Sequence, residues 1–329
     1  MKKLKLTVAL LTLTLLLSLA LTSCQTAVLD EELEIKISVL NGTTGFGAAK
    51  LANDAKEGKT TLNYNITVET DPANVQAGLI NGTIDIAALP TNAAAVVYGK
   101  TNGGVKIAAV NTLGVLYLMT NNVEIKSMDD LKGKTVYAPA QNPAFIFEAI
   151  CRKNGLEPGK DITIDTGYAQ PADLRAALVS GKVDIAVLPE PMVTIAKSAN
   201  KDLAISLDLT DEWEKVFGEN SLMQGCIVVR TAWAEAHPKE LEEFLKAYEE
   251  SVNFTTKNPK EASELIVSTG IFAGKAPVAE KAIPNCNIVY MDADDNISEC
   301  LDKFYSALFN VNPKAIGGKL PDSEIYLSK

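Results

Sequence analysis

Amide and hydroxyl side chains follow several apolar segments of this chain, and they are its best candidates for binding chemistry. Such side chains donate and accept hydrogen bonds without carrying a charge, so they suit a polar small molecule. The rings of Phe46, Phe145 and Tyr168 add apolar contact area. The candidate ligand-binding residues are Asn41, Thr43, Thr44, Phe46, Thr91, Asn92, Asn111, Thr112, Gln141, Asn142, Tyr168 and Glu190.

These candidates have an alternative role, because Thr and Asn also cap helix N-termini. Glu190 begins a predicted helix, where the helix dipole favours a carboxylate. No Arg or Lys occupies the same turns, whereas a tightly bound oxyanion usually takes the paired N–H donors of Arg. The set therefore favours a neutral or weakly basic solute, such as a nitrogen heterocycle, over a sulfonate or similar oxyanion.

Residues for catalysis are sparse in this sequence. The one His, His237, stands before Pro and far in sequence from every predicted turn, so neither a Ser-His-Asp arrangement nor a typical zinc site can be assembled. The glycine-rich segment from Gly42 to Gly47 lacks the Lys of a phosphate-binding loop. We therefore expect no enzyme, no cofactor and no metal, and an enzyme of the same architecture stays the alternative.

The elements that must position the candidate residues alternate between strand and helix patterns. Such alternation is typical of mostly parallel sheets with helices on both faces, which makes the chain an α/β protein. In the first half, the pattern predicts strands at 34–40, 62–68, 84–89 and 105–110, with helices at 45–57, 73–80 and 91–99. After an apolar segment at 113–119 it predicts strands at 134–138, 162–165, 185–188 and 203–207, with helices at 143–154, 172–180 and 190–198.

A short motif occurs twice, as Gly82–Pro90 and again as Gly181–Pro189, 99 residues later. A repeat of this length matches a small domain, so we expect two lobes of one architecture. In open α/β sheets a ligand lies outside the carboxyl ends of the strands, which is where the candidate residues stand. After a strand at 226–229, the tail is predicted to be helical. Its longest helix places Leu241, Leu245, Tyr248 and Val252 on one face.

The N-terminus has the pattern of an export signal. Three lysines precede an apolar run from Leu6 to Leu21, which is short for a membrane span and ends in Leu-Thr-Ser-Cys24. This ending resembles the bacterial lipoprotein signal, in which the Cys is acylated. We therefore expect a signal peptide at 1–23, a tether at 24–32, and a mature chain held by acyl chains on the outer face of the cytoplasmic membrane.

Charge and thiols narrow the function further. Removal of residues 1–23 leaves 306 residues and moves the formal charge from -10 to -13, which excludes nucleic acid as a partner. Four other cysteines, at 151, 226, 286 and 300, form no Cys-x-x-Cys motif. They are interpreted as buried thiols, with a disulfide such as Cys286–Cys300 left open.

With these features the chain resembles a type II periplasmic binding protein, the solute receptor of an ABC importer. It is similar to the branch with receptors for nitrate, sulfonates, taurine and thiamine pyrimidine precursors. The similarity is carried by Gly42–Gly47, Gly82–Pro90, Ser127–Val136, Leu188–Pro191 and Gly225–Arg230.

The resemblance implies two chain crossings between the lobes, near 113–119 and 222–229, which act as a hinge. Lobe one would comprise 33–117 and 227–329, and lobe two 118–226. A monomer would capture a small solute between the lobes and deliver it to the permease of an ABC transporter. A receptor for sulfonates or other oxyanions and a receptor that signals through a membrane sensor are the alternatives.

Overall fold

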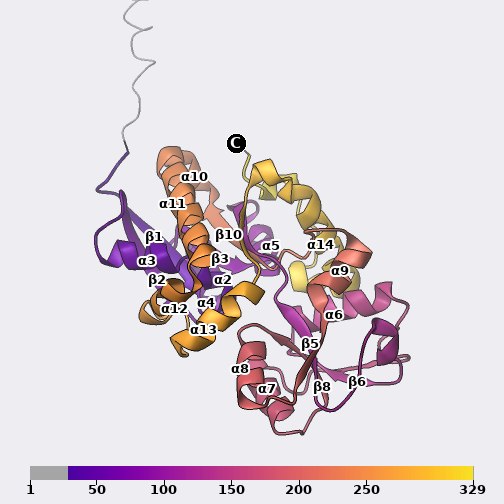
Figure 1. Cartoon of the computed structure of the whole chain (residues 1–329). Coiled ribbons are helices and arrows are strands. Elements are labelled where there is room, and N and C mark those ends of the chain that lie inside the picture. The colour runs from indigo at the N-terminus through magenta and orange to yellow at the C-terminus, as the bar shows by residue number, and fades with distance from the viewer. Residues whose placement is uncertain (1–28, 329) are drawn as a thin grey trace, which may run out of the picture. The chain divides into compact units, whose positions relative to one another are not determined.

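The computed structural model describes residues 29–328, and their strands form two separate sheets flanked by helices (Figure 1). Both sheets lie in one unit of the chain, Glu32–Lys329. The predicted signal peptide at 1–23, Cys24 and residues 25–28 of the predicted tether are outside the described residues. From 29 to 328, the structure contains no helix with the length and apolar character that a membrane span requires.

The first sheet has six strands. Its strand β1 (Glu34–Leu40) lies between β2 (Asn63–Glu69) and β3 (Ile86–Pro90), and its carboxyl end leads into the candidate residues 41–46. Parallel pairing joins β1 to β2 and to β3, with Ile37 opposite both Ile66 and Ile86. Ile37 and Ile86 are buried, whereas Ile66 of the edge strand is partly exposed, so the central strands carry the core. In order across the sheet, its strands are β11 (Ile288–Met291), β4 (Val105–Thr112), β10 (Gly225–Arg230), β3 (Ile86–Pro90), β1 (Glu34–Leu40) and β2 (Asn63–Glu69).

The second sheet has five strands and repeats the order of the first. Strand β6 (Thr135–Tyr137) pairs in parallel with β7 (Thr163–Asp165) and β8 (Ile185–Pro189), as β1 does with β2 and β3. The two copies of the repeated motif end in β3 and β8, the corresponding strands of the two sheets. In order, its strands are β7 (Thr163–Asp165), β6 (Thr135–Tyr137), β8 (Ile185–Pro189), β5 (Leu116–Thr120) and β9 (Ala204–Asp208).

Each sheet receives one antiparallel strand from a chain segment that has just left the other sheet. After β4 the chain passes through residues 113–115 and enters the second sheet as β5, between β8 and β9. After β9 it returns through α9 (Leu209–Phe217) and residues 218–224 and enters the first sheet as β10, between β3 and β4. The segments 113–115 and 218–224 are called the first and second crossing below.

The α/β fold class with two helix-flanked sheets is confirmed, but the sheets are mixed rather than mostly parallel. The reason is the exchange of β5 and β10, which enter in the direction opposite to their neighbours. A second difference lies in the tail, where the helical prediction was wrong for the short strand β11. This strand pairs with β4 at the edge of the first sheet.

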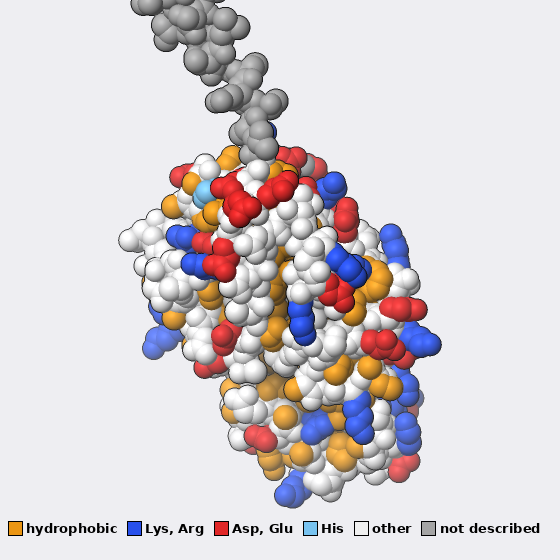
Figure 2. Space-filling view, turned by 90° about the vertical axis from the view of Figure 1, so that its left-hand side faces the viewer, with side chains coloured by type: hydrophobic (Ala, Val, Ile, Leu, Met, Phe, Trp, Pro, Cys, Tyr) orange, Lys and Arg blue, Asp and Glu red, His pale blue; other side chains and the backbone are white. Residues whose placement is uncertain are grey.

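Helices pack on the sheets through apolar faces. In α11 (Pro238–Lys257) the buried residues Leu241, Phe244, Tyr248 and Val252 face the protein, as predicted for three of them, while Glu242, Glu249 and Glu250 are exposed. Figure 2 shows one side of the molecule, where acidic side chains gather near the top of the view. The helices near the first sheet are α2 (Thr43–Phe46), α3 (Ala49–Lys56), α4 (Pro72–Asn81), α5 (Thr91–Thr101), α10 (Thr231–Ala236), α11 (Pro238–Lys257), α12 (Pro259–Ser268) and α13 (Ala276–Ala282).

The second sheet carries α6 (Asn142–Lys153), α7 (Pro171–Val179), α8 (Met192–Ala199) and α9. Helix α14 (Ile297–Val311) packs on α6 and also on the 3-10 helix η4 (Pro313–Ile316), which contacts α5. The ring of Trp213 in α9 lies 5.8 Å from that of Phe304 in α14. The tail therefore contacts the helices of both sheets.

The repeated motif is buried differently in its two copies. Asp85 is buried, accepts a hydrogen bond from the Lys36 backbone at 3.1 Å and pairs with Arg230 at 2.7 Å. Asp184, the matching residue of the second copy, is exposed. The same residue therefore anchors β10 to β3 in one sheet and faces solvent in the other.

The four described cysteines are free thiols. Cys151, Cys226 and Cys286 are buried, and Cys300 is partly exposed. No bridge joins Cys286 to Cys300, which agrees with the interpretation as small apolar residues.

Candidate functional site

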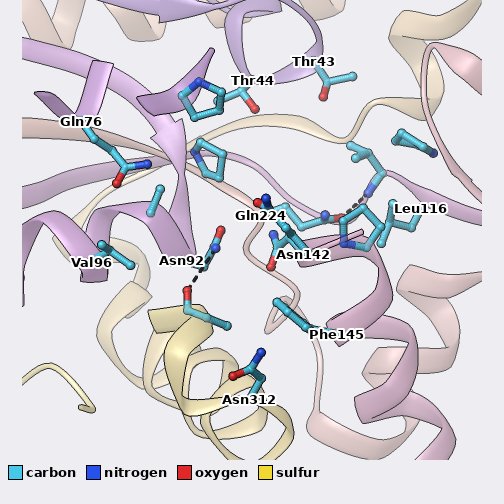
Figure 3. Close-up of a pocket in the computed structure, with 18 of the residues that line it drawn as sticks. Thr43, Thr44, Gln76, Asn92, Val96, Leu116, Asn142, Phe145, Gln224 and Asn312 are labelled. Atoms are coloured by element: carbon cyan, nitrogen blue, oxygen red, sulfur yellow. Dashed lines mark hydrogen bonds between the residues drawn. The ribbon is translucent and has the colours of Figure 1, made fainter. Parts of the chain in front are cut away.

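A cavity of about 490 Å³ lies at the carboxyl ends of the parallel strands of both sheets. Its wall includes the residue at the end of β3, Pro90, and its counterpart at the end of β8, Pro189. Val115 and Gln224, the last residues of the two crossings, also line it. Both sheets and both crossings therefore contribute to one cavity (Figure 3).

The first sheet supplies hydroxyl and amide groups from the starts of two helices. Thr43 and Thr44 open α2 directly after β1, and Asn92 lies in the first turn of α5 directly after β3. The Nδ2 atom of Asn92 donates to the carbonyl oxygen of Ala315 at 3.2 Å. The Oδ1 atom of Asn92 is buried and has no hydrogen-bond partner. This oxygen is a hydrogen-bond acceptor without a donor.

The second sheet supplies Gln141 and Asn142 at the start of α6, with Phe145 one turn later. Gln141 has φ 69 and ψ -128, a backbone conformation that favours Gly. Strained residues of this kind concentrate at binding sites. The Oδ1 atom of Asn142 is buried and has no partner, like that of Asn92. Figure 3 shows Asn92, Asn142 and Gln224 converging on the middle of the cavity.

The lining as a whole is rich in amides. Side-chain amides come from Gln76, Asn92, Gln141, Asn142, Gln224 and Asn312, and apolar contact comes from Val96, Leu116, Phe145 and several prolines. Lys314 is the one charged residue of the lining within the described chain, and its side chain is exposed. The cavity can therefore offer many uncharged hydrogen bonds around a partly apolar wall.

Five of the predicted site residues come together in this cavity. They are Thr43, Thr44, Asn92, Gln141 and Asn142. Asn41 lies outside the lining, and its side chain donates to the Gly270 carbonyl at 3.1 Å. Phe46 is fully buried, and its ring lies 6.1 Å from that of Phe272.

Four more predicted residues also lie elsewhere. Thr91 is buried at the start of α5, and Tyr168 packs its ring 6.0 Å from that of Tyr137. Asn111 is buried and donates to the Thr44 carbonyl and to the Tyr248 hydroxyl, both at 3.0 Å. Thr112 is buried and donates to Asn111 Oδ1 at 3.1 Å. These two residues hold α2 and α11 against the end of β4.

Glu190 is also outside the cavity lining, although it directly follows β8. Its carboxylate accepts hydrogen bonds from the Thr194 backbone at 3.1 Å and the Thr194 hydroxyl at 2.9 Å, so it caps α8. Burial raises the pKa of Glu190 to about 7, and hydrogen bonds from Thr194 and Asn285 oppose that shift. Asn285 precedes β11 of the first sheet, so the carboxylate links the two halves of the protein.

Sequence reasoning missed the lining residues Gln76, Gln224, Asn312 and Lys314. None of them lies in the turn directly after a parallel strand, which was the signal used. Gln224 ends the second crossing, and Asn312 and Lys314 follow α14 in the tail. The presence of Gln224 could have been inferred from the hinge predicted at 222–229, because a hinge between two lobes must border the space between them.

A family model described as NMT1/THI5 like matches residues 58–262, more than half of the chain. The chain belongs to the NMT1/THI5-like family. A crystal structure of an ABC transporter protein from Parabacteroides distasonis covers 90% of this chain and 99% of its own, with TM-score 0.73 and 26% identity. The family and this structure confirm the resemblance to type II periplasmic binding proteins.

Two further relatives are named for the solutes they bind. The periplasmic aliphatic sulphonate-binding protein SsuA from Escherichia coli covers 86% of this chain and 95% of its own at 18% identity, with TM-score 0.68, and shares the fold. The Vibrio cholerae protein named "Probable D-methionine-binding lipoprotein MetQ" is 26% identical over 252 residues, which is 75% of this chain and 91% of the relative. The chain is thus similar to binding proteins that are named for different solutes.

Proposed function

We propose that this NMT1/THI5-like protein captures a small organic solute in the cavity between its two sheets and delivers it to the permease of an ABC transporter. The observation that carries the proposal is the composition of the cavity wall. The carboxyl ends of β3 and β8 and the ends of both crossings meet there, so a bound solute would touch both lobes and the hinge. Lobe one would comprise 33–117 and 227–329, and lobe two 118–226.

The cavity has a suitable size for such a solute. A volume of about 490 Å³ lies within the range of small-molecule sites. Micromolar affinity requires about -8 kcal/mol, which a solute of ten to fifteen heavy atoms reaches at roughly -0.6 to -0.8 kcal/mol per atom. Binding by contact alone is therefore adequate, and no covalent step is required.

The lining favours a neutral or weakly basic solute, such as a nitrogen heterocycle. Thr43, Thr44, Asn92, Gln141 and Asn142 are proposed to contact it, because they bring hydroxyl and amide groups to one space. A ring could pack on Phe145 and the neighbouring prolines. A pyrimidine precursor of thiamine fits this description.

An oxyanion is the second candidate, and two observations favour it. Lys314 stands at the cavity, and the N-termini of α5 and α6 open onto it, where the helix dipole favours an anion. SsuA, which shares the fold, is a sulphonate-binding protein. A sulfonate would, however, meet the unpartnered oxygens of Asn92 and Asn142.

The proposal that the protein is anchored to the membrane is based on the sequence around Cys24. Acylation of Cys24 would hold the chain as a monomer on the outer face of the cytoplasmic membrane, close to a permease. One relative is named as a lipoprotein, which supports this part of the proposal. Substitution of Cys24 by Ala should release the protein from the membrane fraction, whereas retention there would contradict the proposed anchor.

A thermal-shift screen tests the proposed function. The purified protein is heated with pyrimidines, thiamine fragments, sulfonates, D- and L-methionine and other small metabolites. A solute present at 100 times its dissociation constant stabilises the folded protein by about 2.7 kcal/mol, an easily measured shift. Steady turnover of any compound would contradict a receptor and favour an enzyme of the same fold.

A further inference from the structure

We propose that Gln224 is the residue through which a bound solute is coupled to the hinge, and that it selects a solute with a hydrogen-bond acceptor beside an N–H donor. A primary carboxamide and an amino-substituted heterocycle have such an edge. This inference rests on the proposed function and names the class of solute for the same cavity.

Gln224 holds the first crossing on both sides. Its backbone N–H donates to the carbonyl oxygen of Thr112 at 3.0 Å, just before that crossing. Its side-chain Oε1 accepts from the backbone N–H of Val115 at 2.8 Å, at the end of the same crossing. Its carbonyl oxygen accepts from the backbone N–H of Thr91 at 3.0 Å, at the start of α5. One residue of the second crossing therefore fixes the first crossing and a cavity helix together.

These hydrogen bonds also determine which atom of the amide faces the cavity. A backbone N–H can only donate, so the atom of Gln224 that bonds to Val115 must be the oxygen. The Nε2 group is then left as a donor, and it has no hydrogen bond to any other residue in 29–328. Gln224 lines the cavity and is partly exposed, so this donor is accessible to a solute.

The same reasoning identifies which atom of the Asn92 amide is left free, and here it is the oxygen. Its Nδ2 atom donates to the Ala315 carbonyl, which can only accept, so its Oδ1 atom is a fixed acceptor. That oxygen is buried and unpartnered. A donor on the hinge and an acceptor on α5 therefore face the same cavity, and a solute with the complementary pair satisfies both (Figure 3).

The two polar atoms of the Gln224 amide couple the solute to the hinge, because Nε2 would bind the solute while Oε1 binds Val115. A solute acceptor that bonds to Nε2 holds the side chain in the position where Oε1 bonds to Val115. Rotation of the lobes about the first crossing would move Val115 relative to Gln224 and weaken this arrangement. The solute therefore binds the arrangement of the crossings seen here more tightly than a rotated one, so it shifts the population of the protein toward this arrangement.

Two matched probes test the selectivity by isothermal titration. Nicotinamide carries a carbonyl acceptor beside an NH₂ donor, and 3-acetylpyridine has the same shape with a methyl group in place of the NH₂. We expect wild-type protein to bind nicotinamide at least tenfold more tightly, because 3-acetylpyridine leaves Asn92 Oδ1 unpaired. Equal affinity for the two probes, or binding of neither, would overturn the assigned solute class.

Gln224→Glu tests the role of the Nε2 donor, since it keeps an oxygen for Val115 and replaces that donor with an acceptor. Gln76→Glu adds the same charge to the same cavity but lies in α4, away from both crossings. We expect Gln224→Glu to weaken nicotinamide binding at least tenfold and Gln76→Glu to weaken it clearly less. An equal loss in both variants would mean that charge alone acts, and would overturn the role of Gln224.

Different results would contradict the proposed function and the inference about Gln224 and Asn92. If every compound in the thermal-shift screen leaves the melting temperature unchanged, the receptor itself is in doubt. If compounds of the screen bind while the nicotinamide comparison gives no preference, only the inference about Gln224 and Asn92 falls.

Discussion

Glu190→Gln is expected to remove a pH-dependent part of the protein's stability. Glu190 is 3% exposed and lies between Thr194 of α8 and Asn285, which precedes β11. Tyr117 and Cys286 face the same carboxyl group, and both are buried. No cation among these neighbours compensates the charge of the ionised form, so burial favours the protonated acid.

The magnitude follows from the pKa. Burial raises the pKa of Glu190 from 4.5 to about 7 in the folded protein. At a pH between these values the folded state binds a proton that the unfolded state has lost, so stability falls as the pH rises. Each pKa unit corresponds to about 1.4 kcal/mol, which gives a loss of about 2.5 kcal/mol between pH 5 and pH 8.

The assay is urea denaturation of wild type and Glu190→Gln at pH 5, 6, 7 and 8. Gln keeps the shape and neutrality of the protonated acid, so the two proteins should be similarly stable at pH 5. At pH 8 the variant should be more stable by about 2.5 kcal/mol, since it lacks the buried charge. Comparison with wild type cancels the titration of all other groups.

Glu219→Gln serves as the control, because this side chain is exposed. Its stability relative to wild type should not vary with pH. If the difference between wild type and Glu190→Gln is constant from pH 5 to pH 8, or if the variant loses stability at pH 8, the reasoning about this carboxyl group is refuted.

Three further predictions concern stability and accessibility. Asp85→Asn should lower the free energy of unfolding by about 3 kcal/mol, because it removes the carboxylate that pairs with Arg230. Asp184→Asn, in the second copy of the motif, should change it by less than about 0.5 kcal/mol, because Asp184 is exposed. Equal effects in denaturant unfolding would contradict the assigned burial. Gln141→Gly should stabilise the protein by about 1 kcal/mol, since Gly adopts φ 69 without strain, and a lower denaturation midpoint would argue against strain there. Among the four cysteines of residues 29–328, a thiol reagent should label Cys300 first in native protein. Mass spectrometry that finds Cys151, Cys226 or Cys286 labelled before Cys300 would contradict this order.

Local patterns were sufficient for most of the fold. The repeated motif correctly identified β3 and β8 as corresponding strands, and alternation located nearly every strand and helix of both sheets. The exchange of β5 and β10 could not be predicted in this way. Each of these strands is apolar on both faces, and its direction is set by pairing with strands that lie far away in sequence.

The candidate site was predictable only where it follows parallel strands. Residues such as Thr44 and Asn142 stand at helix starts beside the cavity, as the rule for strand ends requires. The rule fails for Asn111, because the end of β4 is covered by β10 and by Tyr248 of α11. It also misses Gln224 and Asn312, whose position depends on the crossings and on the packing of the tail.

The central claim is that the cavity between the two sheets holds the solute. The most direct test titrates the first compound that stabilises the protein in the screen into wild type and into Val96→Trp. Val96 lines the cavity from α5, so the larger indole would fill the space the solute needs (Figure 3). We predict one site on the wild type and no measurable binding to Val96→Trp, with both proteins folded by circular dichroism. Unchanged affinity in the folded variant would contradict the claim.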